Sequence, residues 1–227
     1  MDVFVRSVVC EGILCCFDPA QHSKLLDAGH LVELMAGQAL GSSVAQRSIL
    51  VMLTGLLRVY LASPAGRQVT VRYARPGDVL GLVHLFGAKT AVQAQAIDEV
   101  SLWSLPAQQI EALALMYPGF ALAVARECAD RTVDAMEELR LVTFGSVRQR
   151  LARHLLDLAT CNEDGPLMAR VTQQDLADAA VTVREVVART LKEMRGAGLI
   201  GEADGGIVLL DTSRLDDEAQ GRCGKPA

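Results

Sequence analysis

Residues 120–144 contain neither glycine nor proline and are rich in alanine, glutamate, arginine and leucine, which predicts one long helix. The least polar stripe of this helix alternates steps of four and three residues, a spacing that suits close packing against a second helix. The stripe consists of Ala121, Ala125, Cys128, Thr132, Ala135, Leu139 and Val142. We expect the partner helix to come from a second copy of the chain. Packing of the helix on its own amino-terminal domain is the alternative.

The segment before this helix, residues 31–105, has the pattern of short strands. Apolar runs of about five residues alternate with turns rich in glycine and proline, which is typical of a compact antiparallel barrel or sandwich. The runs are Ser48–Leu53, Leu56–Leu61, Val69–Tyr73 and Ser101–Leu105. The second and third flank a glycine-containing turn and predict a hairpin. A short helix is then expected from Pro106 to about Met116.

A second domain is predicted beyond a hinge at Gly145-Ser146. It begins with a helix over Val147–Cys161, and a pair of shorter helices follows. Thr172, with Asp175 three residues later, has the pattern of a capping box that starts the first helix of the pair. The turn Val181-Thr182 separates the two helices. The residues Asp204-Gly205-Gly206 before Ile207–Leu210 then predict a β-hairpin.

The second helix of the pair carries Arg184, Glu185, Arg189 and Lys192 on its polar face. Residues at this spacing project from the leading turns of one helix face. Arginine donates two hydrogen bonds to guanine, and glutamate accepts one from cytosine N4. The pattern predicts a helix that reads G·C-containing DNA in the major groove. A helix pair with solvated arginines and no DNA role is the alternative.

The net charge of −5 argues against nonspecific binding of nucleic acid by the whole molecule, but the charge is unevenly distributed. Residues 147–200 hold eight Arg and Lys against seven Asp and Glu, a net of +1, so the rest of the chain carries −6. No apolar run approaches the roughly 18 residues of a membrane span, and a secretory signal is absent. We therefore expect a cytoplasmic protein with no membrane partner.

These motifs resemble those of the cyclic-AMP receptor and fumarate–nitrate-reduction regulators, the Crp/Fnr family of bacterial transcription factors. Thr172-Gln173-Gln174-Asp175-Leu176-Ala177 is similar to the family's T-x-x-[DE]-[IL]-[AG] opening, and Arg184-Glu185-x-x-x-Arg189 is similar to its recognition signature. The resemblance covers the whole chain and implies an α+β fold. Its expected parts are a cyclic-nucleotide-binding-like jelly-roll sensor domain (1–117), a dimerisation helix and hinge (118–145), a winged helix-turn-helix (146–215) and a disordered tail (216–227).

The resemblance implies a homodimer that binds a TGTGA-like palindrome in double-stranded DNA, with RNA polymerase as a further candidate partner. The residues expected at the DNA are Thr172, Gln173, Gln174, Thr182, Arg184, Glu185, Arg189 and Lys192. Two positions depart from the family. Val181 stands where glycine is usual, and a β-branched residue resists positive φ, so the turn either differs or tolerates strain. Val183 replaces a small hydroxyl residue, so one phosphate contact is expected to be missing.

The signal is expected to differ from cyclic AMP. Cyclic-nucleotide members of the family hold ribose and phosphate with a Gly-Glu step and a later Arg-[Ser/Thr]-Ala. The corresponding residues here look like Gly81-Leu82 and Lys89-Thr90, which lose a carboxylate and a bidentate guanidinium. The polar pair that the dimer helix offers to adenine looks like Ala135 and Met136. A pocket filled by apolar side chains and a different anionic ligand both remain open.

Cysteines offer other sensors, although their spacing does not give the paired C-x-x-C units of a zinc site. The oxygen-sensing branch of the family holds an iron–sulfur cluster with an amino-terminal cysteine group and a distant cysteine. The candidates here are Cys10, Cys15, Cys16 and Cys128, at a C-x4-C-C spacing that departs from that branch. Haem with a cysteine or His22, His30 or His84 as ligand is a second alternative, and a thiol switch at Cys128 is a third. No metal is assigned.

An enzyme is not expected, because no Ser-His-Asp order, H-E-x-x-H motif or phosphate-binding glycine loop occurs. A cyclic-nucleotide-binding module without a DNA role would account for the strands. It would leave the helix with Arg184, Glu185 and Arg189 unexplained.

Overall fold

The computed structural model describes residues 3–11, 14, 19–41, 47–64, 66, 68–87, 91–161, 165–203 and 206–222. Contacts divide the chain into two compact units, one of residues 1–61 and 71–135 and the other of residues 62–70 and 136–227. Each unit has buried apolar residues of its own.

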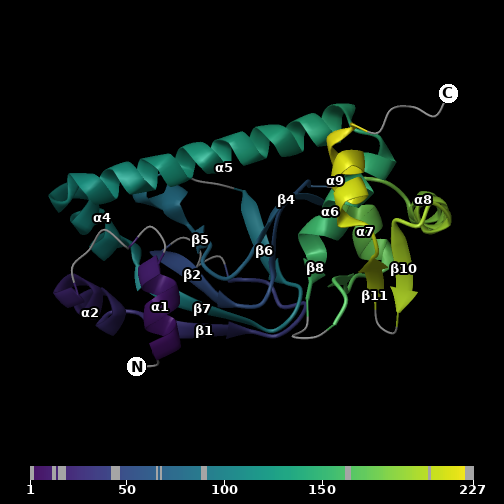
Figure 1. Cartoon of the computed structure of the whole chain (residues 1–227). Coiled ribbons are helices and arrows are strands. Elements are labelled where there is room, and N and C mark those ends of the chain that lie inside the picture. The colour runs from purple at the N-terminus through teal and green to yellow at the C-terminus, as the bar shows by residue number, and fades with distance from the viewer. Residues whose placement is uncertain are drawn as a thin grey trace. The chain divides into compact units, whose positions relative to one another are not determined.

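The strands between residues 30 and 106, most of whose residues belong to the first unit, form two sheets (Figure 1). One sheet is antiparallel and has the order β1-β7-β2-β5, with the bounds His30–Leu34, Val100–Pro106, Ser48–Thr54 and Val79–Leu80. The other has the order β4-β3-β6, with the bounds Gln68–Ala74, Leu57–Ala62 and Val92–Ala96. β3 and β4 are neighbours, which confirms the predicted hairpin.

Strand β2 is buried on both of its faces, and this gives the unit two apolar clusters. Side chains alternate across a strand, so neighbouring residues face opposite sides of the sheet. Leu50 and Met52 pack into a cluster with residues of the second sheet, such as Leu57. Ile49 and Val51 pack into the other cluster, which the helices cover. The continuous apolar run predicted at Ser48–Leu53 is therefore a central strand between two cores.

Helices cover the second cluster. They are α1 (Val3–Glu11), α2 (Pro19–Asp27), the 3-10 helix η2 (Leu82–Phe86), α4 (Ala107–Met116) and the first part of α5 (Pro118–Phe144). α4 and α5 were predicted from the sequence, whereas α1 and α2 were not. The apolar residues of α1 have helical spacing, and its Val5 and Val9 are buried against β2 residues of the cluster.

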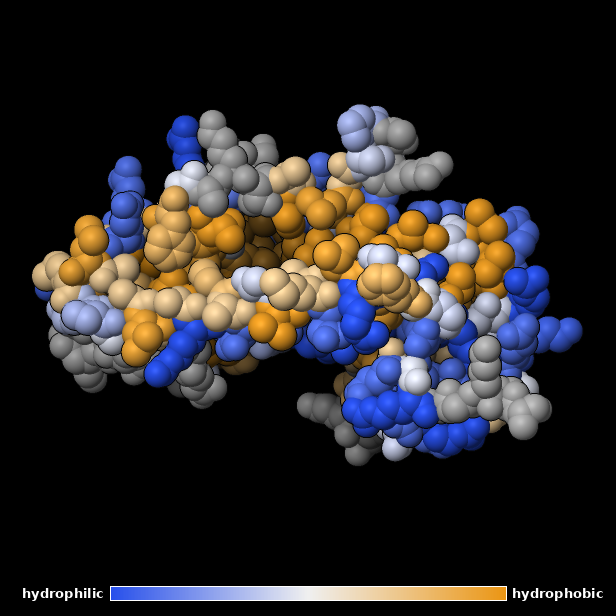
Figure 2. All heavy atoms as spheres, turned by 90° about the horizontal axis from the view of Figure 1, so that it is seen from above, coloured by the Kyte–Doolittle hydropathy of each residue, from blue (hydrophilic) through white to orange (hydrophobic). Residues whose placement is uncertain are grey.

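The stripe predicted on α5 is partly wrong. Cys128 does not lie on an outer seam, because it packs against the same cluster as the buried Phe120 and Val124. The large apolar side chains that α5 exposes are Leu122, Val133, Met136, Leu139 and Phe144. An α-helix turns by about 100° per residue, so the centre of these five side chains lies roughly a quarter turn around the axis of α5 from the centre of the predicted stripe. Apolar side chains follow the exposed face of α5 in Figure 2.

Among its described residues, the second unit combines four whole helices and the end of α5 with a small sheet. The helices are α6 (Val147–Leu158), α7 (Gln173–Ala179), α8 (Arg184–Gly196) and α9 (Thr212–Gln220). The sheet has the order β10-β11-β9-β8, with the bounds Ile200–Ala203, Gly206–Leu209, Met168–Ala169 and Ala159–Thr160. The β10–β11 pair is the predicted hairpin. α6 ends three residues earlier than predicted, because Ala159 and Thr160 pair with β9.

The prediction of a disordered tail over residues 216–227 is wrong for its first part. Residues 216–220 belong to α9, which buries Leu215 and Ala219. Glu218 accepts two hydrogen bonds of 2.8 Å from the Arg148 guanidinium of α6. The amphipathic pattern of α9 begins only at Thr212, so half of the helix fell beyond the predicted domain border. Residues 223–227 lie outside the described part of the chain.

Within the described residues, no single helix has the length and apolar composition of a membrane span. α4 and α5 meet these criteria together, as a pair bent by 118°.

Candidate functional site

The first helix of the predicted pair, α7, begins at a capping box. The Asp175 amide donates to Thr172 Oγ1 at 3.1 Å, and the Thr172 amide lies 3.4 Å from Asp175 Oδ2. These bonds satisfy amides that a helix start otherwise leaves open. Leu176, Ala177 and Ala179 are buried and anchor the helix, which confirms the element predicted from the sequence.

The turn after α7 contains a strained residue. Val181 has φ of 51°, and it is the only non-glycine residue with positive φ in the described part of the chain. The Thr182 amide donates to the Ala177 carbonyl oxygen at 2.9 Å, and Val183 then precedes α8 without a side-chain cap. Of the two outcomes expected for Val181, the structure shows the second: the turn keeps left-handed geometry and tolerates the strain.

Helix α8 presents two different faces. Val187, Thr190, Leu191 and Met194 are buried. Arg184, Glu185, Arg189 and Lys192 are exposed, and none of them forms an ion pair with another described residue. Glu185 and Arg189 do not pair although their spacing of four residues would permit it. Their polar atoms are therefore available to a partner outside the chain.

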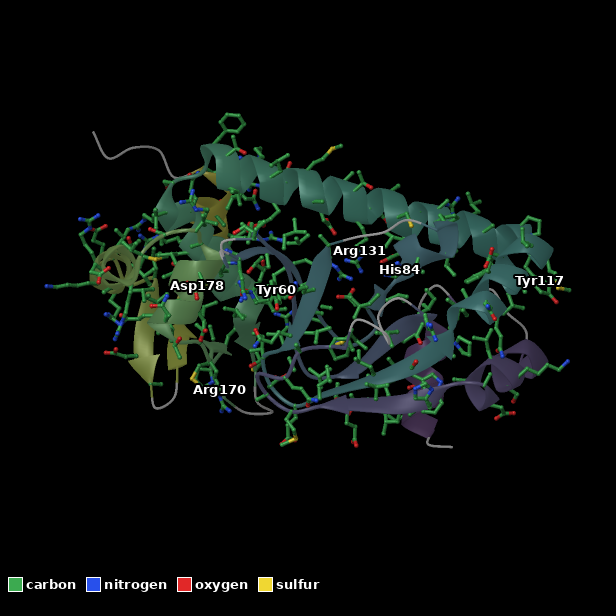
Figure 3. The ribbon with its side chains drawn as sticks, turned by 180° about the vertical axis from the view of Figure 1, so that it is seen from behind. Tyr60, His84, Tyr117, Arg131, Arg170 and Asp178 are labelled. Carbon is green, nitrogen blue, oxygen red and sulfur yellow. The ribbon has the colours of Figure 1, made fainter. Side chains whose placement is uncertain are left out.

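The other predicted contact residues lie at the start of α7 and in the turn. Thr172 and Gln174 are exposed, whereas Gln173 and Thr182 are half-buried. Gln174 Nε2 donates to Asp178 Oδ1 at 3.0 Å. Arg170, labelled with Asp178 in Figure 3, is an exposed cation two residues before Thr172 that the sequence analysis missed. Its only sequence signal was a positive charge close to a helix start.

The carboxyl end of α7 is held by two side chains of α6. Arg150 Nε donates to the Ala180 carbonyl oxygen at 2.8 Å, and His154 Nε2 lies 3.0 Å from the Ala179 carbonyl oxygen. His154 is buried. These two side chains fix the turn that precedes α8, and the sequence analysis did not identify either of them.

The predicted effector residues are placed only in part. Gly81 has φ of 87° and begins η2, and Leu82 is buried in the helix-covered cluster. Leu82 therefore fills the core instead of offering a group to a ligand. Ala135 and Met136 are exposed on α5. Lys89 and Thr90 lie outside the described residues.

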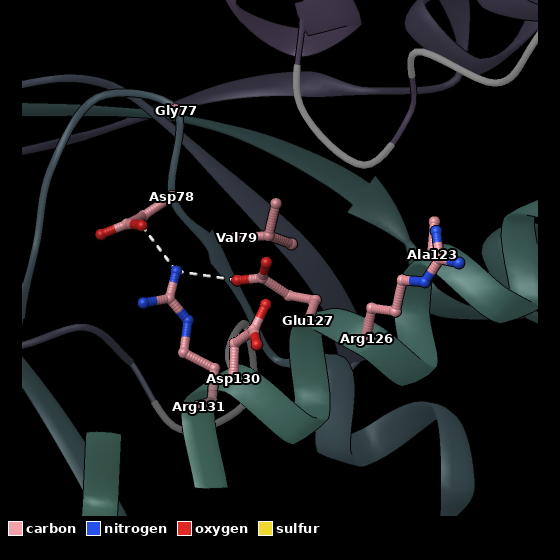
Figure 4. A pocket seen from close by; sticks show the side chains of 8 residues that line it. All are labelled: Gly77, Asp78, Val79, Ala123, Arg126, Glu127, Asp130 and Arg131. Carbon is pink, nitrogen blue, oxygen red and sulfur yellow. Dashed lines mark hydrogen bonds and ion pairs between the residues drawn. The ribbon is translucent and has the colours of Figure 1, made fainter. Parts of the chain in front are cut away.

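A hollow of about 340 Å³ lies in the first unit between the turn at Gly77 and α5 (Figure 4). Arg131 Nη2 bonds both Asp78 Oδ1, at 2.6 Å, and Glu127 Oε1, at 2.8 Å. Burial opposes the charge of Arg131, but the two carboxylates outweigh burial and raise the pKa of the guanidinium. Arg126 points away from this cluster in Figure 4. Arg131 is thus bonded to two of the three carboxylates that line the hollow, and Asp130 is the third.

The cysteine candidates are tested at one position. Cys128 is partly buried, and burial together with the Glu127 carboxylate raises the pKa of its thiol. A raised pKa lowers the thiolate fraction and hence the reactivity. The side chain of Cys10, as well as Cys15 and Cys16, lies outside the described residues. Among the described residues, no group of three or more His, Cys, Asp or Glu side chains is arranged for a metal ion.

Two family models match the chain. The model of the cyclic nucleotide-binding domain matches residues 31–117, and that of the Crp-like helix-turn-helix domain matches residues 149–218. The first match covers the two sheets and α4. The second covers α7, α8 and the β10–β11 hairpin.

Relatives of known name or structure extend over both units. The transcriptional regulator LdrP of Thermus thermophilus is 37% identical over 175 residues, which are 73% of this chain and 84% of the relative. A solved regulator of the CRP family from the same organism has a TM-score of 0.67 at 27% identity and covers 83% of this chain and 96% of its own. A regulator from Eubacterium rectale at 21% identity has a similar fold, with a TM-score of 0.71 over 92% and 97% of the two chains.

Proposed function

Because the chain belongs to the Crp/Fnr family of transcriptional regulators, we propose that α8 is the recognition helix and reads a TGTGA-like half-site. One observation carries the proposal: Arg184, Glu185 and Arg189 are exposed on the leading turns of α8 and form no ion pairs among the described residues. Arginine recognises guanine O6 and N7, and glutamate accepts from cytosine N4. Phosphates on either side of these base pairs are contacted by the polar residues around the start of α7, in the turn and on α8, namely Arg170, Thr172, Gln173, Gln174, Thr182 and Lys192.

We further propose that two copies of the chain bind together, with RNA polymerase as a later partner at the promoter. Supporting this, α5 exposes Val133, Met136 and Leu139, three large apolar side chains that a single chain leaves in water. A twofold dimer presents two recognition helices about 34 Å apart, one turn of DNA. The binding site is therefore a palindrome.

The control of this dimer does not use cyclic AMP in the usual manner. Leu82 lies in the core and supplies no carboxylate to a ribose hydroxyl. Arg131 is engaged by Asp78 and Glu127. Calorimetry with cyclic AMP and cyclic GMP tests this point. Micromolar binding that also tightens DNA binding would contradict it.

A gel-shift titration tests the DNA-binding role. A palindrome with TGTGA arms is compared with a scrambled duplex of the same length and composition at physiological salt. We expect the palindrome to bind at least about 10³-fold more tightly, the lower end for specific recognition. Failure to bind either duplex, with and without candidate effectors, would point to a module without a DNA role, and equal affinity for both duplexes would refute sequence-specific recognition.

A further inference from the structure

One guanidinium group in the second unit caps the carboxyl ends of two helices. Arg150 Nη1 donates to the Gly145 carbonyl oxygen at 2.6 Å, just beyond α5, and Arg150 Nε donates to the Ala180 carbonyl oxygen at 2.8 Å, just beyond α7. Gly145 belongs to the hinge predicted from the sequence, and Ala180 begins the turn that leads to α8. Arg150 thus joins the hinge to that turn directly.

Both helix ends need such a group. A helix leaves carbonyl oxygens without internal partners at its carboxyl end, and the helix dipole makes that end negative. Neither α5 nor α7 has a basic residue in its last turn. The planar guanidinium presents its donors in a fixed fork, so one side chain reaches two oxygens that a single ammonium group could not hold in the same geometry.

The two acceptors sit on backbone that has little freedom to move. A Cβ at Gly145 would lie 2.4 Å from the Leu141 carbonyl oxygen, so this position requires glycine for the close approach. Ala180 is fully buried, and Val181 follows it in the left-handed region. His154 holds the neighbouring Ala179 carbonyl one helical turn along α6. Arg150 therefore links two backbone segments that are each constrained.

Arg150 has charged neighbours, but its described hydrogen bonds are to backbone oxygens. Glu138 of α5 lies close enough to Asp157, Arg153 and Arg150 of α6 for their charges to act on its carboxyl. Arg153 pairs with Asp157 at 2.9 Å. The hydrogen bonds described for the Arg150 guanidinium go to carbonyl oxygens, with Glu138 as a nearby charge.

We infer that Arg150 is a positioning residue for DNA recognition, which couples the end of α5 to the turn before α8 and so fixes the orientation of each recognition helix relative to the hinge. This inference rests on the proposed function, because an oriented recognition helix matters only if α8 binds DNA. Arg150 itself makes no base contact in this account. It acts by setting which separation of the two half-sites the dimer accepts.

The variants Arg150→Gln and Arg150→Lys test the coupling, with Arg153→Gln as the control on the same helix. Each is titrated with palindromes whose arms are at the preferred separation or are moved apart by one or two base pairs. The wild type and Arg153→Gln should prefer one separation by about tenfold or more. Both Arg150 variants should lose most of this preference while circular dichroism shows an intact fold. Full preference in a folded Arg150→Lys protein would overturn the inference.

Hydrogen exchange of the same full-length proteins gives a readout without DNA. Amides of residues 142–146 and 180–186 should exchange faster in both Arg150 variants than in Arg153→Gln, whereas those of β10 and β11 should not change. Unchanged exchange in both segments would overturn the coupling whatever the DNA results. If both Arg150 variants exchange faster but the wild-type protein binds no palindrome, the proposed function is refuted, whereas the link made by Arg150 is supported.

Discussion

The Thr182 amide donates a hydrogen bond to the Ala177 carbonyl oxygen at 2.9 Å and closes a turn in which the intervening Val181 has φ of 51°. Left-handed geometry costs an L-residue about 1–2 kcal/mol, because Cβ approaches the following carbonyl oxygen. The Val181 side chain is 43% exposed, so its burial offsets little of this conformational cost. The turn before α8 therefore stores strain.

Val181→Gly should raise the free energy of unfolding by about 1 kcal/mol, because glycine adopts this φ without the Cβ clash. Urea unfolding followed by circular dichroism measures the change. Ala188→Gly, in the middle of α8, is the opposite control and should lower the free energy by about 1 kcal/mol. Destabilisation by Val181→Gly would show that the valine side chain contributes packing that outweighs its strain.

Glu138 should make the stability of the second unit decrease as pH rises. Burial, and then Asp157, raises the pKa of Glu138 from 4.5 to about 7, against Arg153 and Arg150. Between these two values the folded protein keeps a proton that the unfolded chain has lost, so stability falls as pH rises from about 4.5 to about 7. Glu138→Gln should remove this fall and unfold at a higher temperature than the wild type at pH 8.

Melting temperatures at pH 5, 6, 7 and 8 check this prediction. Glu137→Gln is the matched control at the preceding residue of α5. Glu137 is exposed and pairs with Arg140. It should keep the pH dependence of the wild type. The prediction fails if Glu138→Gln and Glu137→Gln melt with the same dependence on pH.

The exposed apolar face of α5 should control the oligomeric state. Val133→Glu and Met136→Glu place a charge on side chains that are 59% and 64% exposed in one chain, and each should convert a dimer into monomers. Sedimentation velocity at micromolar concentration measures the change. Leu31→Glu, at a half-exposed position of β1, should remain dimeric. A wild-type protein that sediments as a monomer would contradict the dimer itself.

Features encoded by neighbouring residues were predicted well. The absence of breakers over residues 120–144 predicted α5, and Thr172 with Asp175 predicted the start of α7 within one residue. Helix propensity and capping depend on residues a few positions apart, so one segment contains the whole signal. The β3–β4 hairpin was predictable for the same reason.

Features that depend on distant contacts were missed or misplaced. The side of α5 that faces the core is chosen by β2 and the other helices, and the sequence of α5 alone placed Cys128 on the wrong face. Arg150 was not identified, because its acceptors are backbone oxygens, one of them 30 residues away. Every residue has a backbone carbonyl oxygen, so the residue types at the acceptor positions do not predict such a bond. Leu82 was identified as a missing carboxylate, but its place in the core required the folded structure.

The most direct test of the account is the affinity of Arg184→Ala for a TGTGA palindrome and for two altered palindromes, each with one of the two guanines of every arm replaced. Arg184 is exposed on the first turn of α8, so the variant should fold and melt as the wild type does. We predict that the wild type loses about 1–3 kcal/mol of binding free energy per replaced base pair, whereas Arg184→Ala binds one of the two altered palindromes as tightly as the unaltered one. If Arg184→Ala kept the wild-type preference at both guanines, Arg184 would read neither base, and the proposed role of α8 would be contradicted.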